Sequence, residues 1–237
     1  MLFRSNQVDP FNLTGSGASL TLRNIEFTAS DLKIENVENL TMYDCIVSNL
    51  PVVDANQIYS KGDMVFDRCH FNGNFYFCPV DDNRNIILKN SRVTNYLSFC
   101  ESNNFLATRT IGYIEVRNNY LKEAGYIACD VLKGLIHGNH SNPSSFSSFF
   151  IESGPLEKHE NLTITQNKFA GGLAIQSLIS TNIIIADNLF QNSSNNSFIK
   201  NTKLGAVCRN IRIVNNKTDS IEWRGNDVNN VKICMNK

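Results

Sequence analysis

Asn161-Leu-Thr-Ile-Thr-Gln-Asn-Lys-Phe169 is the stretch that decides the fold, because its pattern recurs along the chain. With Leu162 as position zero, apolar residues stand at positions zero, two and seven, and Asn167 stands at position five. The starts lie 20 to 28 residues apart, a spacing typical of repeat architectures. The same frame begins at Leu20, Leu40, Met64, Ile86, Ile114, Gly134, Leu162, Ile183, Ile211 and Val231.

Each repeat consists of strand-like segments. Alternation with a period of two, as in Leu20-Thr-Leu22, predicts a strand with one apolar face. A second alternating segment follows, as in Phe149-Phe-Ile151, and position seven begins a third; no stretch has helical spacing. A leucine-rich horseshoe would repeat a different leucine spacing, and a propeller blade needs about 40 residues. The prediction is a solenoid of parallel strands with about ten turns.

Position five supports stacking of the turns. Asparagine tolerates the left-handed conformation of a tight corner, and stacked amides can form hydrogen bonds along the axis. The chain contains 34 asparagines, and such a ladder accounts for part of that excess. The column at position five reads Ile25, Cys45, Cys69, Ser91, Asn119, Asn139, Asn167, Asn188, Asn216 and Asn236.

With an asparagine ladder beside aliphatic and aromatic stacks, the sequence resembles the right-handed parallel β-helix proteins of the pectate-lyase-like superfamily. The resemblance covers residues 18 to 237 as a single all-β domain, and residues 1 to 17 are expected to form an N-terminal cap or an incoming strand. It implies a protein that binds, and cleaves as a hydrolase or lyase, a polysaccharide in a groove along the helix. The catalytic motifs of polygalacturonase-like enzymes do not match: Asp81-Asp82 stands beside Pro79, and His137-Gly138 lacks the preceding glycine.

Phage tailspikes of this architecture supply the alternative. Tailspikes are homotrimers that fold in the cytoplasm, so the resemblance also implies a possible homotrimer. In this alternative the chain is a non-catalytic structural or adhesin module, such as a tailspike shaft, or a fragment of a larger enzyme. A tailspike-like protein would be found in the virion or outside the cell after release. Residues 1 to 7 lack the apolar segment of a signal peptide, and no run approaches the length of a membrane span.

Composition limits the partners. Lys+Arg and Asp+Glu both number 22, so no basic field attracts nucleic acid or an anionic membrane. The seven cysteines are odd in number and lack metal-type C-x-x-C pairs. Cys45 and Cys69 are expected to be small buried ladder residues rather than a disulfide, and the count favours folding in a reducing compartment. Neither a metal nor a cofactor is expected.

Candidate site residues follow from columns, because outward positions in successive turns lie about 4.8 Å apart. In the second strand, one column places Asp130 beside Glu152. Two carboxylates at that distance would have separated pKa values, so this pair is predicted to supply the acid and the nucleophile or base of a glycosidase.

The outward column at position three of the first strand is predicted to bind an acidic sugar. The column begins at Arg23 and ends at Thr165, and the residues proposed to contact the sugar are Tyr43, Asp67, Lys89, Arg117 and His137. The loops around residues 99 to 111, 139 to 148 and 191 to 197 are expected to wall the groove. The alternative is that both columns are solvated sheet faces whose charges pair with one another.

Overall fold

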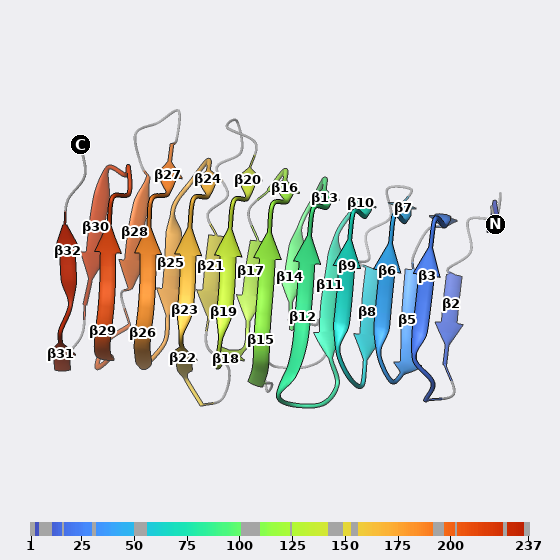
Figure 1. Ribbon diagram of the computed structural model, residues 1–237, viewed down its shortest axis with the longest axis horizontal. Coiled ribbons are helices and arrows are strands. Elements are labelled where there is room, and N and C mark those ends of the chain that lie inside the picture. Colours follow the sequence, from blue (N-terminus) through green and yellow to red (C-terminus); the bar gives the residue numbers. More distant parts are fainter. Residues whose placement is uncertain are drawn as a thin grey trace.

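The chain folds into a parallel β-helix built from three sheets, A, B and C. A computed structural model describes residues 3–4, 11–15, 17–29, 32–49, 56–100, 110–123, 125–141, 149–152, 156–191, 197–201, 203–224 and 227–234. In Figure 1 the chain climbs the near face in sheet C, crosses the top in sheet A and descends the far face in sheet B. It advances from right to left as it does so, which makes the coil right-handed.

Every pairing between the described strands is parallel, and successive turns stack strand on strand in each sheet. Sheet A contains β1 (Phe3–Arg4), β4 (Glu26–Ala29), β7 (Ile46–Asn49), β10 (His70–Asn72), β13 (Arg92–Val93), β16 (Tyr120–Leu121), β20 (His140–Ser141), β24 (Lys168–Phe169) and β27 (Leu189–Phe190). Sheet B contains β2 (Phe11–Thr14), β5 (Leu32–Val37), β8 (Asn56–Ser60), β11 (Phe75–Pro79), β14 (Leu97–Phe99), β17 (Gly125–Ala128), β21 (Phe149–Glu152), β25 (Leu173–Gln176), β28 (Phe198–Asn201) and β30 (Ser220–Trp223).

Sheet C is the longest of the three and contains β3 (Leu20–Arg23), β6 (Leu40–Tyr43), β9 (Met64–Asp67), β12 (Arg84–Lys89), β15 (Thr110–Arg117), β18 (Asp130–Val131), β19 (Gly134–His137), β22 (Lys158–Glu160), β23 (Leu162–Thr165), β26 (Ile179–Ala186), β29 (Val207–Val214), β31 (Asp227–Asn229) and β32 (Lys232–Cys234). In this sheet β18 and β19, β22 and β23, and β31 and β32 share one turn each.

The repeat frame predicted the sheets correctly, whereas the number of complete turns is smaller than predicted. Nine of the ten predicted starts lie in strands of sheet C, and Val231 directly precedes β32. About eight turns, from β3 to β28, have a strand in all three sheets. The ninth touches sheet A only through a bridge between Leu189 and Lys217, and the tenth is described only in sheet C. At the other end β1 and β2 pair with β4 and β5, so residues before 18 also join sheets A and B.

The core fills the space between the three sheets. From the turn of Leu40 to that of Ile211, apolar side chains at positions zero, two and seven point inward and are almost fully buried, whereas Leu20 and Val231 are partly buried and Ile233 is 41% exposed. Aromatic rings stack between turns and between sheets: the centroids of Phe66 and Phe77 are 4.3 Å apart, and those of Phe149 and Phe169 are 5.3 Å apart. Each buried phenylalanine contributes about 1.5–3 kcal/mol through removal of apolar surface from water.

The predicted asparagine ladder is present at the corner between sheets C and A. The inner ladder comprises Asn119, Asn139, Asn167, Asn188 and Asn216, none more than 2% exposed. Each amide from Asn119 to Asn188 donates from Nδ2 to the Oδ1 of the next turn, at 2.8–3.0 Å. The same Nδ2 also donates to a backbone carbonyl, for example that of Ile136 from Asn167. Asn236, predicted to extend the column, lies outside the described residues.

The left-handed residue of this corner is at position four, one residue earlier than predicted. Asn118, Gln166, Asp187 and Asn215 have φ values of 55°, 56°, 57° and 51°, whereas no inner-ladder residue has a positive φ. Position four turns the chain, and position five is then aimed inward, where its amide meets the next turn. The left-handed turn and the ladder hydrogen bonds, both expected at position five, are therefore divided between positions four and five.

Toward the N-terminus the ladder continues with smaller side chains. The backbone N–H of Cys69 donates to Ser91 Oγ at 3.0 Å, and Cys69 Sγ donates to the carbonyl of Met42 at 3.5 Å. All seven cysteines are free thiols, which confirms that Cys45 and Cys69 are buried ladder residues and not a disulfide. The hydrogen bond shared with Cys45, together with burial, raises the pKa of the Cys69 thiol, so this thiol stays protonated at neutral pH.

Candidate functional site

The column predicted on sheet C is brought together as expected. Strand register places each of its members directly beside the next. It runs through Arg23, Tyr43, Asp67, Lys89, Arg117, His137 and Thr165.

The members of this column contact one another and their neighbours. The guanidinium of Arg23 lies 4.2 Å from the centroid of the Tyr43 ring. Asp67 accepts hydrogen bonds from Arg68 and Asn90, both at 2.9 Å. These contacts satisfy the charges locally, and substrate binding by the column stays a prediction.

The remaining members are paired in the same way. Lys89 Nζ lies 3.8 Å from Asp67 Oδ2, and Arg117 Nε lies 3.0 Å from Glu115 Oε1. His137 Nδ1 lies 3.0 Å from Thr165 Oγ1. This half of sheet C therefore has the character of a solvated face with mutually paired charges, which was the alternative interpretation of the sequence.

The predicted proximity of Asp130 and Glu152 is wrong. Strand β21 pairs with β17 so that Ala128, not Asp130, lies beside Glu152. Asp130 stands past the corner, in β18 of sheet C, opposite Thr110. Its side chain is fully buried, and its two carboxylate oxygens accept backbone N–H groups of Leu156 at 2.7 Å and Lys158 at 2.8 Å. This arrangement closes the corner of the next turn.

Glu152 faces outward from sheet B in a different setting. The hydroxyl of Tyr126, one turn earlier, donates to Glu152 Oε2. Gln176 lies beside Glu152 in the following turn. Glu152 is half-buried, and its carboxylate is held by the Tyr126 hydroxyl.

A row of aromatic side chains along sheet B leads up to this carboxylate. Tyr76, Ser98, Tyr126 and Phe150 follow one another in a single outward column of sheet B. The ring of Tyr96 lies 6.0 Å from that of Tyr76, centroid to centroid. We name the set Tyr76, Tyr96, Tyr126, Phe150 and Glu152 the aromatic face; all five side chains are half-buried.

The three long loops lie outside the described residues, except at their ends. Residues 101–109 connect β14 of sheet B to β15 of sheet C. Residues 142–148 and 192–196 connect strands of sheet A to β21 and β28 of sheet B. All three connections therefore begin or end at a strand of sheet B, the sheet that carries the aromatic face.

A second asparagine column on sheet C was not predicted. The outer ladder comprises Asn161, Asn182, Asn210 and Asn230, which directly precede positions zero of their frames and are all exposed. Each Nδ2 from Asn182 onward donates to the Oδ1 of the preceding turn, at 2.9–3.0 Å. The signal was present in the sequence, because asparagine recurs at the position before the start in the last three frames and in that of Leu162.

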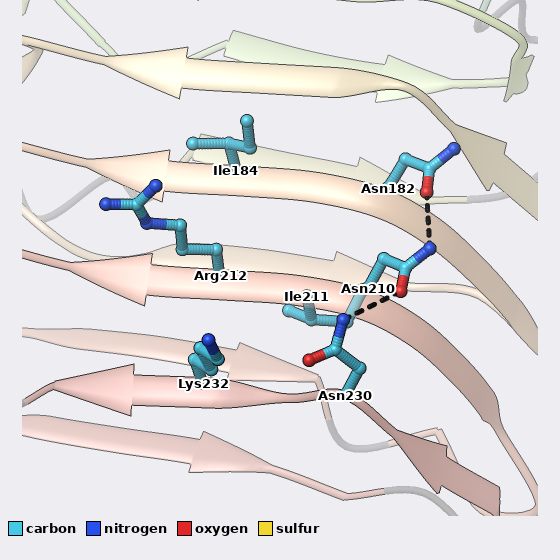
Figure 2. Close-up of a pocket in the computed structure, with 7 residues that line it drawn as sticks. All are labelled: Asn182, Ile184, Asn210, Ile211, Arg212, Asn230 and Lys232. Carbon is cyan, nitrogen blue, oxygen red and sulfur yellow. Dashed lines mark hydrogen bonds between the residues drawn. The ribbon is translucent and has the colours of Figure 1, made fainter.

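The outer ladder forms one side of a shallow groove of about 320 Å³, the C-terminal groove, shown in Figure 2. Ile184, Arg212 and Lys232 form one column across from the amides, and the buried Ile211 lies between that column and the outer ladder. Its lining residues are Asn182, Ile184, Asn210, Ile211, Arg212, Asn230 and Lys232.

The described residues include no group of three or more His, Cys, Asp or Glu side chains placed to hold a metal ion. In the same part of the chain, no helix is long and apolar enough to cross a membrane.

Comparisons with known proteins found no matching family model, no matching curated protein and no matching solved structure. The resemblance to the pectate-lyase-like superfamily is therefore supported at the level of the parallel β-helix alone.

Proposed function

We propose that this protein binds a polysaccharide along the outer face of sheet B. The observation that carries the proposal is the aromatic face, in which rings from successive turns flank an accessible carboxylate. Tyrosine and phenylalanine offer large apolar surfaces with little rotamer entropy to lose, which suits the C–H faces of sugar rings. Carboxylates and phenol hydroxyls are groups that form hydrogen bonds with sugar hydroxyls.

Cleavage is the second candidate, and the hydrogen bond between Tyr126 and Glu152 favours it. Some glycosidases use a tyrosine nucleophile in place of a carboxylate. In that scheme Glu152 accepts the phenol proton as Tyr126 attacks the anomeric carbon, and the leaving oxygen takes its proton from solvent. Water then cleaves the glycosyl–tyrosine bond and loses a proton to solvent, while Glu152 returns its proton to the phenol oxygen. Asp130 has no part in it, because its oxygens already accept backbone N–H groups.

The test is a panel of neutral and acidic polysaccharides, read by affinity electrophoresis and by release of reducing ends. We expect Tyr126→Ala and Phe150→Ala to weaken binding by about tenfold or more, as for aromatic residues at the centre of an interface. Tyr120→Ala is the matched control, because Tyr120 is an equally half-buried tyrosine on sheet A, and it should bind as the wild type does.

The outcomes separate the candidates. Reducing ends released by the wild type and lost in Glu152→Gln, with binding retained, would add cleavage to the proposal. Binding without release would indicate a non-catalytic polysaccharide-binding module. Absence of binding across the panel by a folded protein would refute the proposal and favour a structural shaft.

A further inference from the structure

The C-terminal groove offers more hydrogen-bond donors than acceptors. A side-chain amide nitrogen carries two N–H groups. Asn182, Asn210 and Asn230 each use one of them within the outer ladder, and the described residues provide no partner for the other. Each Oδ1 of Asn182 and Asn210 already accepts one hydrogen bond. Each amide oxygen also has two lone pairs, so this side of the groove is a row of amides that can both donate and accept, and the excess of donors comes from Arg212 and Lys232.

The other side carries two positive charges. Arg212 and Lys232 are register partners on β29 and β32, and both are exposed. None of the ion pairs formed among the described residues includes either side chain. Acidic residues neutralise the column in the first half of sheet C, but the outward positions here are Ile184, Ala186, Val214 and Cys234.

An exposed apolar side chain continues the cationic column. Ile184 is the register partner of Arg212 and is 40% exposed. A small free anion gains nothing from such a surface, whereas the C–H face of a sugar ring can cover it. Two cations with an exposed apolar side chain beside them, facing a row of amides, match a ring that carries both a negative group and hydroxyls.

We propose that the C-terminal groove binds an anionic saccharide, a sugar ring that carries a carboxylate or sulfate group. The anionic group lies between Arg212 and Lys232, the ring lies over Ile184, and ring hydroxyls accept N–H groups of the outer ladder. This site is on sheet C, separate from the aromatic face, and it stands whether or not sheet B binds a polysaccharide.

The experiment measures binding of the full chain to polygalacturonate and dextran sulfate, with neutral dextran and oligo-deoxythymidine as comparison ligands. We expect the double variant Arg212→Ala/Lys232→Ala to lose about tenfold or more in affinity for an anionic polysaccharide. The control Lys168→Ala/Lys217→Ala removes the same charge from exposed positions outside the groove and should lose less than about twofold. Urea unfolding of both double variants verifies that each is folded.

Asn210→Ala removes an amide from the groove without changing its charge, and it should weaken binding by about threefold. This result would distinguish a built site from simple attraction between opposite charges.

Four results would overturn the proposal. The wild type could fail to bind either anionic polysaccharide, or the two double variants could weaken binding equally. Oligo-deoxythymidine could bind as tightly as polygalacturonate at equal charge, which would indicate non-specific attraction. Finally, Tyr126→Ala could abolish binding while Arg212→Ala/Lys232→Ala leaves it intact, which would assign the saccharide to sheet B.

Discussion

The two asparagine ladders place the same side chain in opposite circumstances. Inner-ladder residues are at most 2% exposed, and the Asn167 amide takes part in four hydrogen bonds, with Ile136, Asn188 and, twice, Asn139. The Asn210 amide of the outer ladder is exposed and takes part in two, with Asn182 and Asn230. Where water is absent every polar atom has to be paired inside the protein, whereas at the surface unused N–H groups remain available to a ligand.

The largest effect is expected for Asn167→Ala. The substitution removes the hydrogen-bond partner of the buried Asn139 backbone N–H and takes one hydrogen bond each from the Ile136 carbonyl, Asn188 Oδ1 and Asn139 Nδ2, so the free energy of unfolding should fall by about 3–5 kcal/mol. Urea denaturation followed by circular dichroism measures the loss. A loss below about 1 kcal/mol would show that water enters the corner and that the inner ladder is not sealed.

A buried polar group outside the ladders provides the second test. His159, in β22 between Val131 and Ser180, is fully buried, and neither ring nitrogen makes a hydrogen bond of ordinary geometry with a described residue. Burial lowers its pKa from 6.5 to about 3, against a smaller opposite influence of the Ile151 backbone. Unlike the inner-ladder amides, this side chain can acquire a charge on unfolding.

Between pH 6.5 and about 3 the unfolded chain binds a proton at His159 that the folded chain excludes, so stability should fall as the pH falls. Well below pH 6.5 the slope from this group is about 1.4 kcal/mol per pH unit. Urea midpoints of the wild type and of His159→Leu, compared from pH 7.5 to 4.5, isolate the contribution. Parallel curves for the two proteins would contradict the expected exclusion of the proton.

The smallest effect on stability is expected for Asn210→Ala. The amide is exposed, water replaces its two hydrogen bonds, and the free energy of unfolding should change by less than about 0.5 kcal/mol. The measurement is the same urea series used for Asn167→Ala. If the two variants lose similar amounts, burial does not distinguish the ladders and the comparison fails.

Most of the fold could be predicted from the sequence, because a solenoid repeats one local pattern. Alternation of apolar and polar residues predicted the strands, because it depends on residues of the same turn. The residue at position five predicted the ladder, because it contacts the same position in the next turn. The column from Arg23 to Thr165 was correct for the same reason. The outer ladder repeats at the position before the last four starts, but exposed asparagines are common in this chain, so their recurrence alone does not predict a ladder.

The candidate site was less predictable, because it depends on where a strand ends. A shift by two residues keeps every side chain on its predicted face, so alternation could not distinguish Ala128 from Asp130 as the neighbour of Glu152. The corner at Cys129 moves Asp130 to another sheet. The contact of Tyr126 with Glu152 follows from the register found in the structure and not from the pattern of the sequence.

The two ladders also oppose each other electrostatically. In the inner ladder each Nδ2 points to the following turn, whereas in the outer ladder each Nδ2 points to the preceding one. A side-chain amide carries a dipole similar to that of a peptide unit, about 3.5 D. Aligned alone, either column would build a macrodipole that grows with every turn. Because they run antiparallel, a turn that adds one amide to each adds almost no axial dipole, and a longer coil would not concentrate charge at its ends.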